Sequence, residues 1–138
     1  MSELMIDLTG GIPMIDVKLW SRSKGMYRSM LMTVDTGATV TTLSKDVLYL
    51  LGYDKPDKTK EKKRITTASG VEYVDEMTVD KIKIAGFELL NVNVYAHTFP
   101  QESFSNGVIG INILSRFDLY LLFSKGILRF IPIVGDAD

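Results

Sequence analysis

Apolar and polar side chains alternate with a period of two through most of this 138-residue chain. The clearest alternating runs, separated by turn-forming residues, lie at 13–20, 26–34, 77–84 and 87–95. A period of two sends successive side chains to opposite faces of a strand, so each run predicts a strand with one buried face. Two short segments, 45–51 and 112–117, look helical instead. The pattern predicts a mainly β fold, a closed or nearly closed β-barrel-like domain with one or two short helices.

The length and composition suit one domain. With 138 residues and 46% hydrophobic content, the chain is long enough to bury one substantial core. The sequence shows neither an internal repeat nor a linker. We therefore expect a single domain over residues 1–138, with its core at about residues 13–130.

The charge balance gives no reason to expect a nucleic-acid or membrane partner. The 16 Lys and Arg residues nearly balance the 17 Asp and Glu residues, for a formal net charge of −1. A basic stretch at 55–64 is diluted by acidic residues and lacks aromatic ones, so we interpret it as a solvated loop. No apolar run approaches the roughly 20 residues that cross a bilayer. The start lacks the features of a secretory signal and cysteine is absent, which predicts a cytoplasmic location.

The residue inventory narrows the possible chemistry. The absence of cysteine excludes disulfides, thiolate catalysis and cysteine-ligated metals. The single histidine, His97, sits where a strand is expected to end, and a catalytic triad would also need a placed nucleophile and an orienting group. One histidine is also too few for a typical histidine metal site. We therefore expect no metal or cofactor, and carboxylates are the natural candidates for catalysis.

One carboxylate has a distinctive setting. The apolar run 30–34 leads directly into Asp35, Thr36, Gly37 and Ala38, which would place a carboxylate at the start of a tight loop. Gly37 has no Cβ, so the backbone there can approach a ligand closely. Alone, Asp-Thr-Gly is a weak signal that equally suits a polar turn between strands. A Gly-Val-Ile-Gly run at positions 107–110, just before the helix-like segment, strengthens it.

Together, the Asp-Thr-Gly-Ala loop, the Val-Ile-Gly strand and the hairpin between them resemble the retropepsin-like aspartic proteases over roughly residues 13–130. The resemblance implies a closed, single-domain retropepsin fold. It implies that Asp35 is the catalytic carboxylate and that the Thr36 hydroxyl bonds across a dimer axis. Gly37 and Ala38 would line the floor of the cleft and present backbone groups to the substrate.

The same resemblance implies where a substrate would lie. The segment 65–73 looks like a flap, a hairpin that closes over bound peptide, with its tip at 68–70. The strand that ends at position 109 would wall pockets that favour apolar side chains near the cut bond. The implied substrate-binding and flap residues are Ile65, Ala68, Ser69, Gly70, Val108 and Ile109.

Only one Asp-Thr-Gly occurs in the chain, so the resemblance implies that a second copy completes the site. Attack of water on an amide needs a base to take its proton and an acid to protonate the departing side. Two adjacent carboxylates share one proton and supply both roles, and the pair titrates as a unit. A two-fold axis is the economical way to bring identical loops together. The implied protein is a homodimeric aspartic endopeptidase that acts on a peptide or protein substrate.

The sequence departs from the retroviral pattern at two positions, and from many cellular and bacterial relatives at a third. Retroviral enzymes usually carry an acid after the Ala and an Arg after the second Gly, where this chain has Thr39 and Ile111. Many relatives in the cellular and bacterial branch have Asp where this chain has Asn112. The missing ion-pair residues point toward that branch. They also leave an alternative open: a catalytically weak or inactive retropepsin-like module for peptide binding or assembly.

Two placements remain open for the chain ends. In the family, the ends often interleave to build a dimer sheet, and the run 127–131 could serve there with 4–6 as its partner. Alternatively, the last run closes the monomer's own barrel. Composition does not decide between them.

Overall fold

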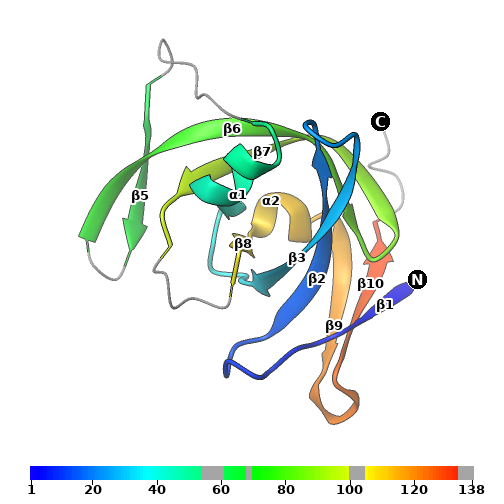
Figure 1. Cartoon of the computed structure of the whole chain (residues 1–138). Coiled ribbons are helices and arrows are strands. Elements are labelled where there is room, and N and C mark those ends of the chain that lie inside the picture. The colour runs from blue at the N-terminus through cyan, green and yellow to red at the C-terminus, as the bar shows by residue number, and fades with distance from the viewer. Residues whose placement is uncertain (54–60, 68–69, 100–104, 134–138) are drawn as a thin grey trace.

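The computed structural model describes residues 1–53, 61–67, 70–99 and 105–133, and within them the fold is mainly β with two short α-helices (Figure 1). The predicted fold class is confirmed. The elements in chain order are β1 (Ser2–Met5), β2 (Met14–Ser21), β3 (Met26–Val34), β4 (Thr42–Ser44), α1 (Lys45–Leu50), β5 (Lys63–Thr67), β6 (Gly70–Ile84), β7 (Phe87–His97), β8 (Gly107–Ile109), α2 (Ile111–Leu114), β9 (Phe117–Leu122), the 3-10 turn η1 (Phe123–Lys125) and β10 (Ile127–Pro132).

Six strands close into a barrel. The seven-stranded sheet has the order β2-β3-β8-β4-β7-β6-β5, and β2 also pairs with β6. That extra pairing, which sets Leu19 opposite Ile82, joins the two sides of the ring. β5 lies outside the ring and pairs only with β6 among the described strands. The closed barrel expected from the alternating pattern therefore forms, and one hairpin projects from it (Figure 1).

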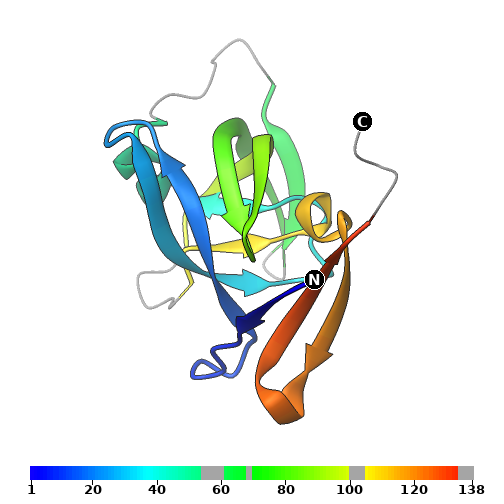
Figure 2. The same cartoon turned by 90° about the vertical axis from the view of Figure 1, so that its right-hand side faces the viewer.

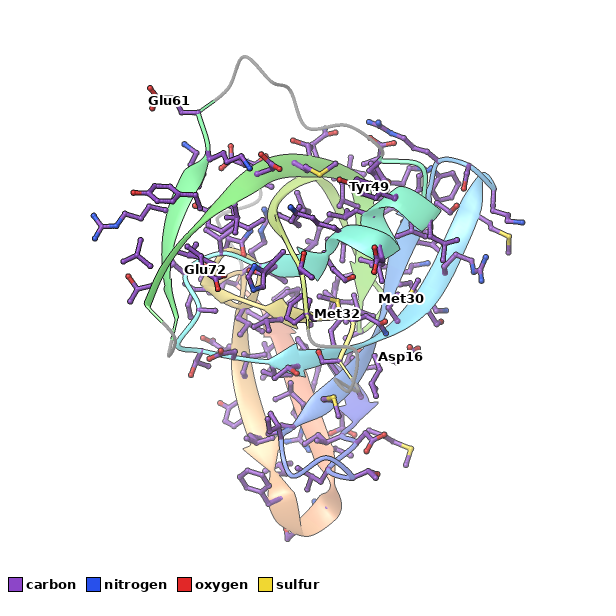
Figure 3. All side chains as sticks on the ribbon, turned by 60° about the vertical axis from the view of Figure 1, so that its left-hand side comes forward. Asp16, Met30, Met32, Tyr49, Glu61 and Glu72 are labelled. Carbon is purple, nitrogen blue, oxygen red and sulfur yellow. The ribbon has the colours of Figure 1, made fainter. Side chains whose placement is uncertain are left out.

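The barrel core comes from the alternating positions. In β2, Ile15, Val17 and Leu19 are at most 1% exposed, whereas the residues between them face solvent. Each fully buried aliphatic side chain contributes about 1.5–3 kcal/mol relative to leaving it exposed. Met30 and Met32 lie on β3 (Figure 3); Met32 is buried and Met30 packs against the core.

Tyr53 ties α1 to the barrel wall. α1 begins at Lys45, and the hydroxyl of its N-cap residue, Ser44, accepts from the Val47 N–H at 3.5 Å. After the helix ends, the Tyr53 side chain is 2% exposed and donates its O–H to the Trp20 carbonyl at 2.7 Å. The Asp80 N–H donates to the same phenol oxygen at 3.3 Å. Burial raises the pKa of Tyr53, in keeping with a neutral phenol bridging two strands.

The second helix is shorter than the sequence predicted. The segment 112–117 was expected to be helical, but α2 spans Ile111–Leu114 and Phe117 already begins β9. The reason is packing: the Phe117 ring lies 5.3 Å from Phe87 and 5.4 Å from Phe130, inside the core. Aromatic burial in a strand thus ends the helix early.

The chain ends form a separate sheet. β1, β10 and β9 pair antiparallel in the order β1-β10-β9, with Leu4 opposite Leu128. The β9–β10 hairpin extends away from the barrel (Figure 2). The run 127–131 therefore pairs with the N-terminal strand of its own chain and does not close the barrel.

Among the described residues, no helix is both long and apolar enough to cross a membrane. The cytoplasmic location stays a prediction.

Candidate active site

The loop that starts at Asp35 is held from two sides. β3 and β8 run parallel with Val34 opposite Ile109, and the Asp35 N–H donates to the Ile109 carbonyl at 3.1 Å. On the other side, the Val34 N–H donates to the Pro13 carbonyl at 3.0 Å. The chain then turns at once, because the Ala38 N–H donates to the Asp35 carbonyl at 3.2 Å. The position of the carboxylate is thus set by paired strands.

The Asp35 side chain faces solvent from this fixed loop. Its Oδ1 accepts a hydrogen bond from the Gly37 N–H at 2.8 Å. A Cβ added at Gly37 would lie 3.1 Å from the same oxygen, closer than ordinary van der Waals contact. Glycine therefore leaves room for the backbone to bind the carboxylate. Because Asp35 and Thr36 are both exposed, the loop is accessible to a substrate or to a second copy of the chain.

The outgoing part of the loop passes very close to the end of β8. A Cβ at Gly110 would lie 2.7 Å from the Ala38 carbonyl oxygen and 2.7 Å from the Val40 carbonyl carbon. A Cβ at Gly107 would collide with the Thr42 carbonyl oxygen. The two glycines that flank the Val-Ile pair are therefore required by the close approach of two backbones.

A polar network lies beneath the loop. Thr41 is fully buried, and its hydroxyl accepts from the Gly110 N–H at 3.1 Å and donates to Asn112 Oδ1 at 2.8 Å. The Thr41 N–H donates to the same amide oxygen, also at 2.8 Å. Asn112 Nδ2 donates to the Asn93 carbonyl at 2.8 Å. Sequence reasoning noted Asn112 only as a departure from the family and missed Thr41 altogether.

A pocket of about 470 Å³ opens between the active-site loop and the β5 strand. Its lining combines the outgoing loop with one side of the β5–β6 hairpin and the end of β7. The lining residues are Gly37, Ala38, Thr39, Val40, Thr42, Arg64, Ile65, Thr66 and Tyr95. The pocket therefore brings together three residues selected from the sequence: Gly37, Ala38 and Ile65.

The hairpin expected from the segment 65–73 is present. β5 and β6 pair antiparallel from Lys63 opposite Val74 to Thr67 opposite Gly70. Gly70 has a φ of +122°, a conformation open to glycine but costly for other residues. The tip residues Ala68 and Ser69 lie outside the described residues. Arg64, Ile65 and Thr66 of this hairpin line the pocket beside the loop, and its role as a flap stays a prediction.

Val108 and Ile109 lie at the end of β8 beside the Asp35 loop, and their role as pocket walls stays a prediction. Ile109 is fully buried, and Val108 is half-buried, opposite both Thr33 and Thr42. Both belong to β8, which lies between β3 and β4 inside the sheet. Neither residue lines the pocket beside the loop. Within the single chain, the Ile109 carbonyl accepts the Asp35 N–H and so helps to fix the loop.

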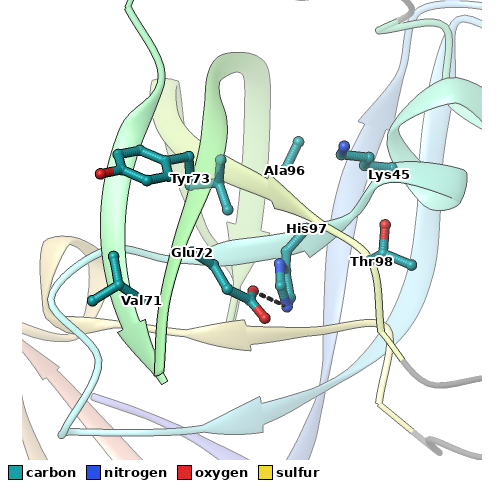
Figure 4. A pocket seen from close by; sticks show the side chains of 8 residues that line it. Lys45, Val71, Glu72, Tyr73, Ala96, His97 and Thr98 are labelled. Atoms are coloured by element: carbon teal, nitrogen blue, oxygen red, sulfur yellow. Dashed lines mark ion pairs between the residues drawn. The ribbon is translucent and has the colours of Figure 1, made fainter. Parts of the chain in front are cut away.

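A second pocket, of about 450 Å³, lies along β6 and β7 (Figure 4). There His97 Nε2 lies 3.3 Å from a carboxylate oxygen of Glu72, which ties the end of β7 to the hairpin. His97 does not line the pocket beside Asp35, and no group of three or more His, Asp or Glu side chains placed to hold a metal ion occurs among the described residues.

Comparison with known proteins decides the family. Residues 27–116 match the family model described as gag-polyprotein putative aspartyl protease. The chain belongs to this family. A crystal structure of a retropepsin-like aspartic protease from Rickettsia conorii is similar in fold, with a TM-score of 0.66 and 21% sequence identity over 93% of this chain and 87% of that one. No curated protein matches the chain.

The retropepsin-like fold explains the arrangement of the site. The match to the family covers β3, the Asp35 loop, the hairpin, β8 and α2. In this chain, the loop after β3 and the β8–α2 junction cross at Gly110, where the two backbones come into close contact. The elements joined by the crossing are about 70 positions apart, as the Thr41–Asn112 separation of 71 shows.

Proposed function

We propose that this chain is an aspartic endopeptidase that hydrolyses peptide bonds as a homodimer, with one Asp35 from each copy. The observation that carries the proposal is an exposed Asp35 carboxylate, fixed by Gly37 and Ile109, in a chain that belongs to an aspartyl protease family. A second copy and a peptide or protein substrate are the partners. The proposal involves no cofactor, nucleic acid or membrane.

The chemistry requires two carboxylates. One takes the proton of the attacking water and the other protonates the departing side, and two close carboxylates achieve this by sharing one proton. A single chain supplies one such loop, and a two-fold axis through the exposed loop would supply the other. The exposed Thr36 hydroxyl is then available to bond across the axis.

The substrate would lie between the loop and the hairpin. The pocket there offers apolar side chains, including Val40, Ile65 and Tyr95, and backbone groups at Gly37 and Ala38. An extended peptide satisfies its own backbone groups by pairing with such segments, while pockets accept alternate side chains. We therefore propose a preference for apolar side chains near the cut bond, with the hairpin as flap and Ala68, Ser69 and Gly70 at its tip. In a dimer, Val108 and Ile109 would wall these side-chain pockets.

A second candidate function is peptide binding or assembly without useful turnover. One observation favours it. Thr39 and Ile111, both exposed, stand where retroviral enzymes have their ion-pair residues. Without those charges a dimer would depend on other contacts. A chain that stays monomeric at high concentration and still binds peptides would favour this function.

The test is cleavage of a diverse peptide mixture by the wild type and by Asp35→Asn, read by mass spectrometry. Removing the carboxylate should reduce cleavage by about 10²–10⁴-fold, the usual contribution of a general acid or base. Because Asp35 is exposed, the variant should keep its circular dichroism spectrum and its oligomeric state. Equal cleavage by both proteins would rule out the proposal.

A further inference from the structure

The Asn112 side chain joins three parts of the fold at once. It projects from α2, accepts two hydrogen bonds from Thr41 in the outgoing part of the loop, and donates one to β7 at the Asn93 carbonyl, each at 2.8 Å. The partners lie 71 and 19 positions away in the chain. The backbone N–H of Asn112 adds a bond to the Thr39 carbonyl at 3.2 Å. This one residue therefore connects the loop after Asp35 and α2 with the neighbouring strand β7.

The backbone partners fix the orientation of the amide. The Thr41 N–H can only donate, so the atom that faces it must be the amide oxygen. The Asn93 carbonyl can only accept, so the atom that faces it must be the amide nitrogen. An amide supplies an acceptor and a donor together, whereas an ionised carboxylate supplies acceptors alone. Asparagine thus satisfies both the Thr41 donors and the Asn93 acceptor.

Thr41 links Asn112 to the loop and to the pocket wall through its other hydrogen bonds. Its hydroxyl accepts from the Gly110 N–H, and its carbonyl accepts from the Tyr95 N–H at 2.9 Å. Its neighbours Val40 and Thr42 line the pocket beside Asp35, as does Tyr95. Because Thr41 is fully buried and bonded on every polar group, moving it would move both the loop and the pocket wall.

We propose that Asn112 is a positioning residue for this active site: through Thr41 it sets the path of the chain that leaves Asp35 and the wall of the adjoining pocket. The inference rests on the proposed peptidase function only for its effect on turnover. The acceptor half of the amide positions the loop, and the donor half ties the loop and α2 to β7. Arg116, whose Nε donates to the Asn112 carbonyl at 3.3 Å, is the one charged side chain that bonds residue 112 among the described contacts.

The two halves of the amide can be separated by substitution. Asn112→Ala removes both, whereas Asn112→Asp keeps the acceptors for Thr41 and removes the donor to Asn93. The Thr41 amide reports the acceptor half directly, because its hydrogen-bond partner is a side chain. Hydrogen exchange at this amide, followed by NMR, therefore tests the network whether or not the protein cleaves peptides. Ser115→Ala, an exposed change at the end of the same helix, is the matched control.

We expect Asn112→Ala to speed exchange of the Thr41 amide by about 10-fold or more. It should also lower kcat by about 10²-fold, the effect of a displacement of about 1 Å at a reacting group. Asn112→Asp should keep the Thr41 protection and recover kcat to within about 10-fold of the wild type. Ser115→Ala should match the wild type in both measurements.

Two results would overturn the inference. One is a Thr41 amide that stays equally protected in Asn112→Ala; the other is an Asn112→Asp variant that loses protection as fully as the alanine variant. If Asn112→Ala does not fold, the aspartate variant alone decides, because it must keep Thr41 protected. If the Thr41 amide responds to the substitutions as expected but the wild type cleaves no peptide, the proposed function is contradicted and the hydrogen-bond network is still supported.

Discussion

Replacing Gly110 with alanine would place a methyl group where two backbones already touch. The added Cβ would lie 2.7 Å from the Ala38 carbonyl oxygen and from the Val40 carbonyl carbon. Those atoms cannot rotate away as a flexible side chain would. Gly110 has a φ of −101° and a ψ of −175°, an extended conformation that alanine adopts freely. The expected damage therefore comes from the close approach and not from backbone strain.

The size of the effect follows from the contacts that must give way. Overpacking a tight site costs about 1–3 kcal/mol. Moving the strands apart also weakens the bonds from Ile111 N–H to the Ala38 carbonyl and from Gly110 N–H to Thr41, at about 1 kcal/mol each. Alanine recovers about 0.4–1 kcal/mol by restricting the unfolded chain. We expect the free energy of unfolding to fall by about 2–4 kcal/mol.

Urea denaturation followed by circular dichroism measures this change. Gly86→Ala is the matched control, since its Cβ meets nothing within 4 Å and only its φ of +85° is unfavourable. That strain should cost about 1–2 kcal/mol, in a turn between β6 and β7. Cleavage activity should fall in Gly110→Ala and remain in Gly86→Ala. The reasoning is refuted if Gly110→Ala is as stable as the wild type, or more stable than Gly86→Ala.

Two further predictions concern the Tyr53 bridge and the charge beside it. Tyr53→Phe leaves the Trp20 carbonyl and the Asp80 N–H without their partner, so unfolding free energy should drop by about 1–3 kcal/mol in urea denaturation; a change under about 0.5 kcal/mol would contradict this. Hydrogen bonds from Arg22 lower the pKa of Asp80 below its usual 3.8. The folded pKa lies below the unfolded one, so this stabilisation is present above about pH 4 and disappears as pH falls through the folded pKa. Both side chains are partly exposed, so Asp80→Asn should cost only about 0.2–1 kcal/mol at neutral pH, and the difference from wild type should vanish in acid. A difference that grows below about pH 4 would show that another group is responsible.

Local patterns in the sequence predicted the barrel well. The β2–β3 hairpin, the capped α1 and the β6–β7 hairpin follow directly from alternation and turn residues. The second half of the hairpin expected at 65–73 and the run expected at 77–84 proved to be one strand, β6. Its buried positions Val74 and Val79 are five residues apart, so the buried face changes between the two runs and the period of two breaks there. A phase change of this kind looks like a strand end in the sequence.

The site was predictable only in part. Asp35 stood out because an apolar strand leads into a short polar loop, a local feature. Asn112 and Thr41 did not stand out, because their importance comes from hydrogen bonds between residues 71 positions apart. The parallel pairing of β8 with β3, which buries Ile109 and fixes the Asp35 loop, also joins segments far apart in the sequence. Long-range pairing, which a single sequence does not display, decided each of these outcomes.

The central claim is that two Asp35 loops form one site. The most direct measurement is sedimentation and calorimetry of the wild type with a transition-state-type aspartic protease inhibitor, with Asp35→Asn as the control. The account predicts one inhibitor bound per two chains, a dimer that tightens on binding, and little binding by the variant. A monomer that binds one inhibitor per chain, or a protein indifferent to the inhibitor, would contradict it.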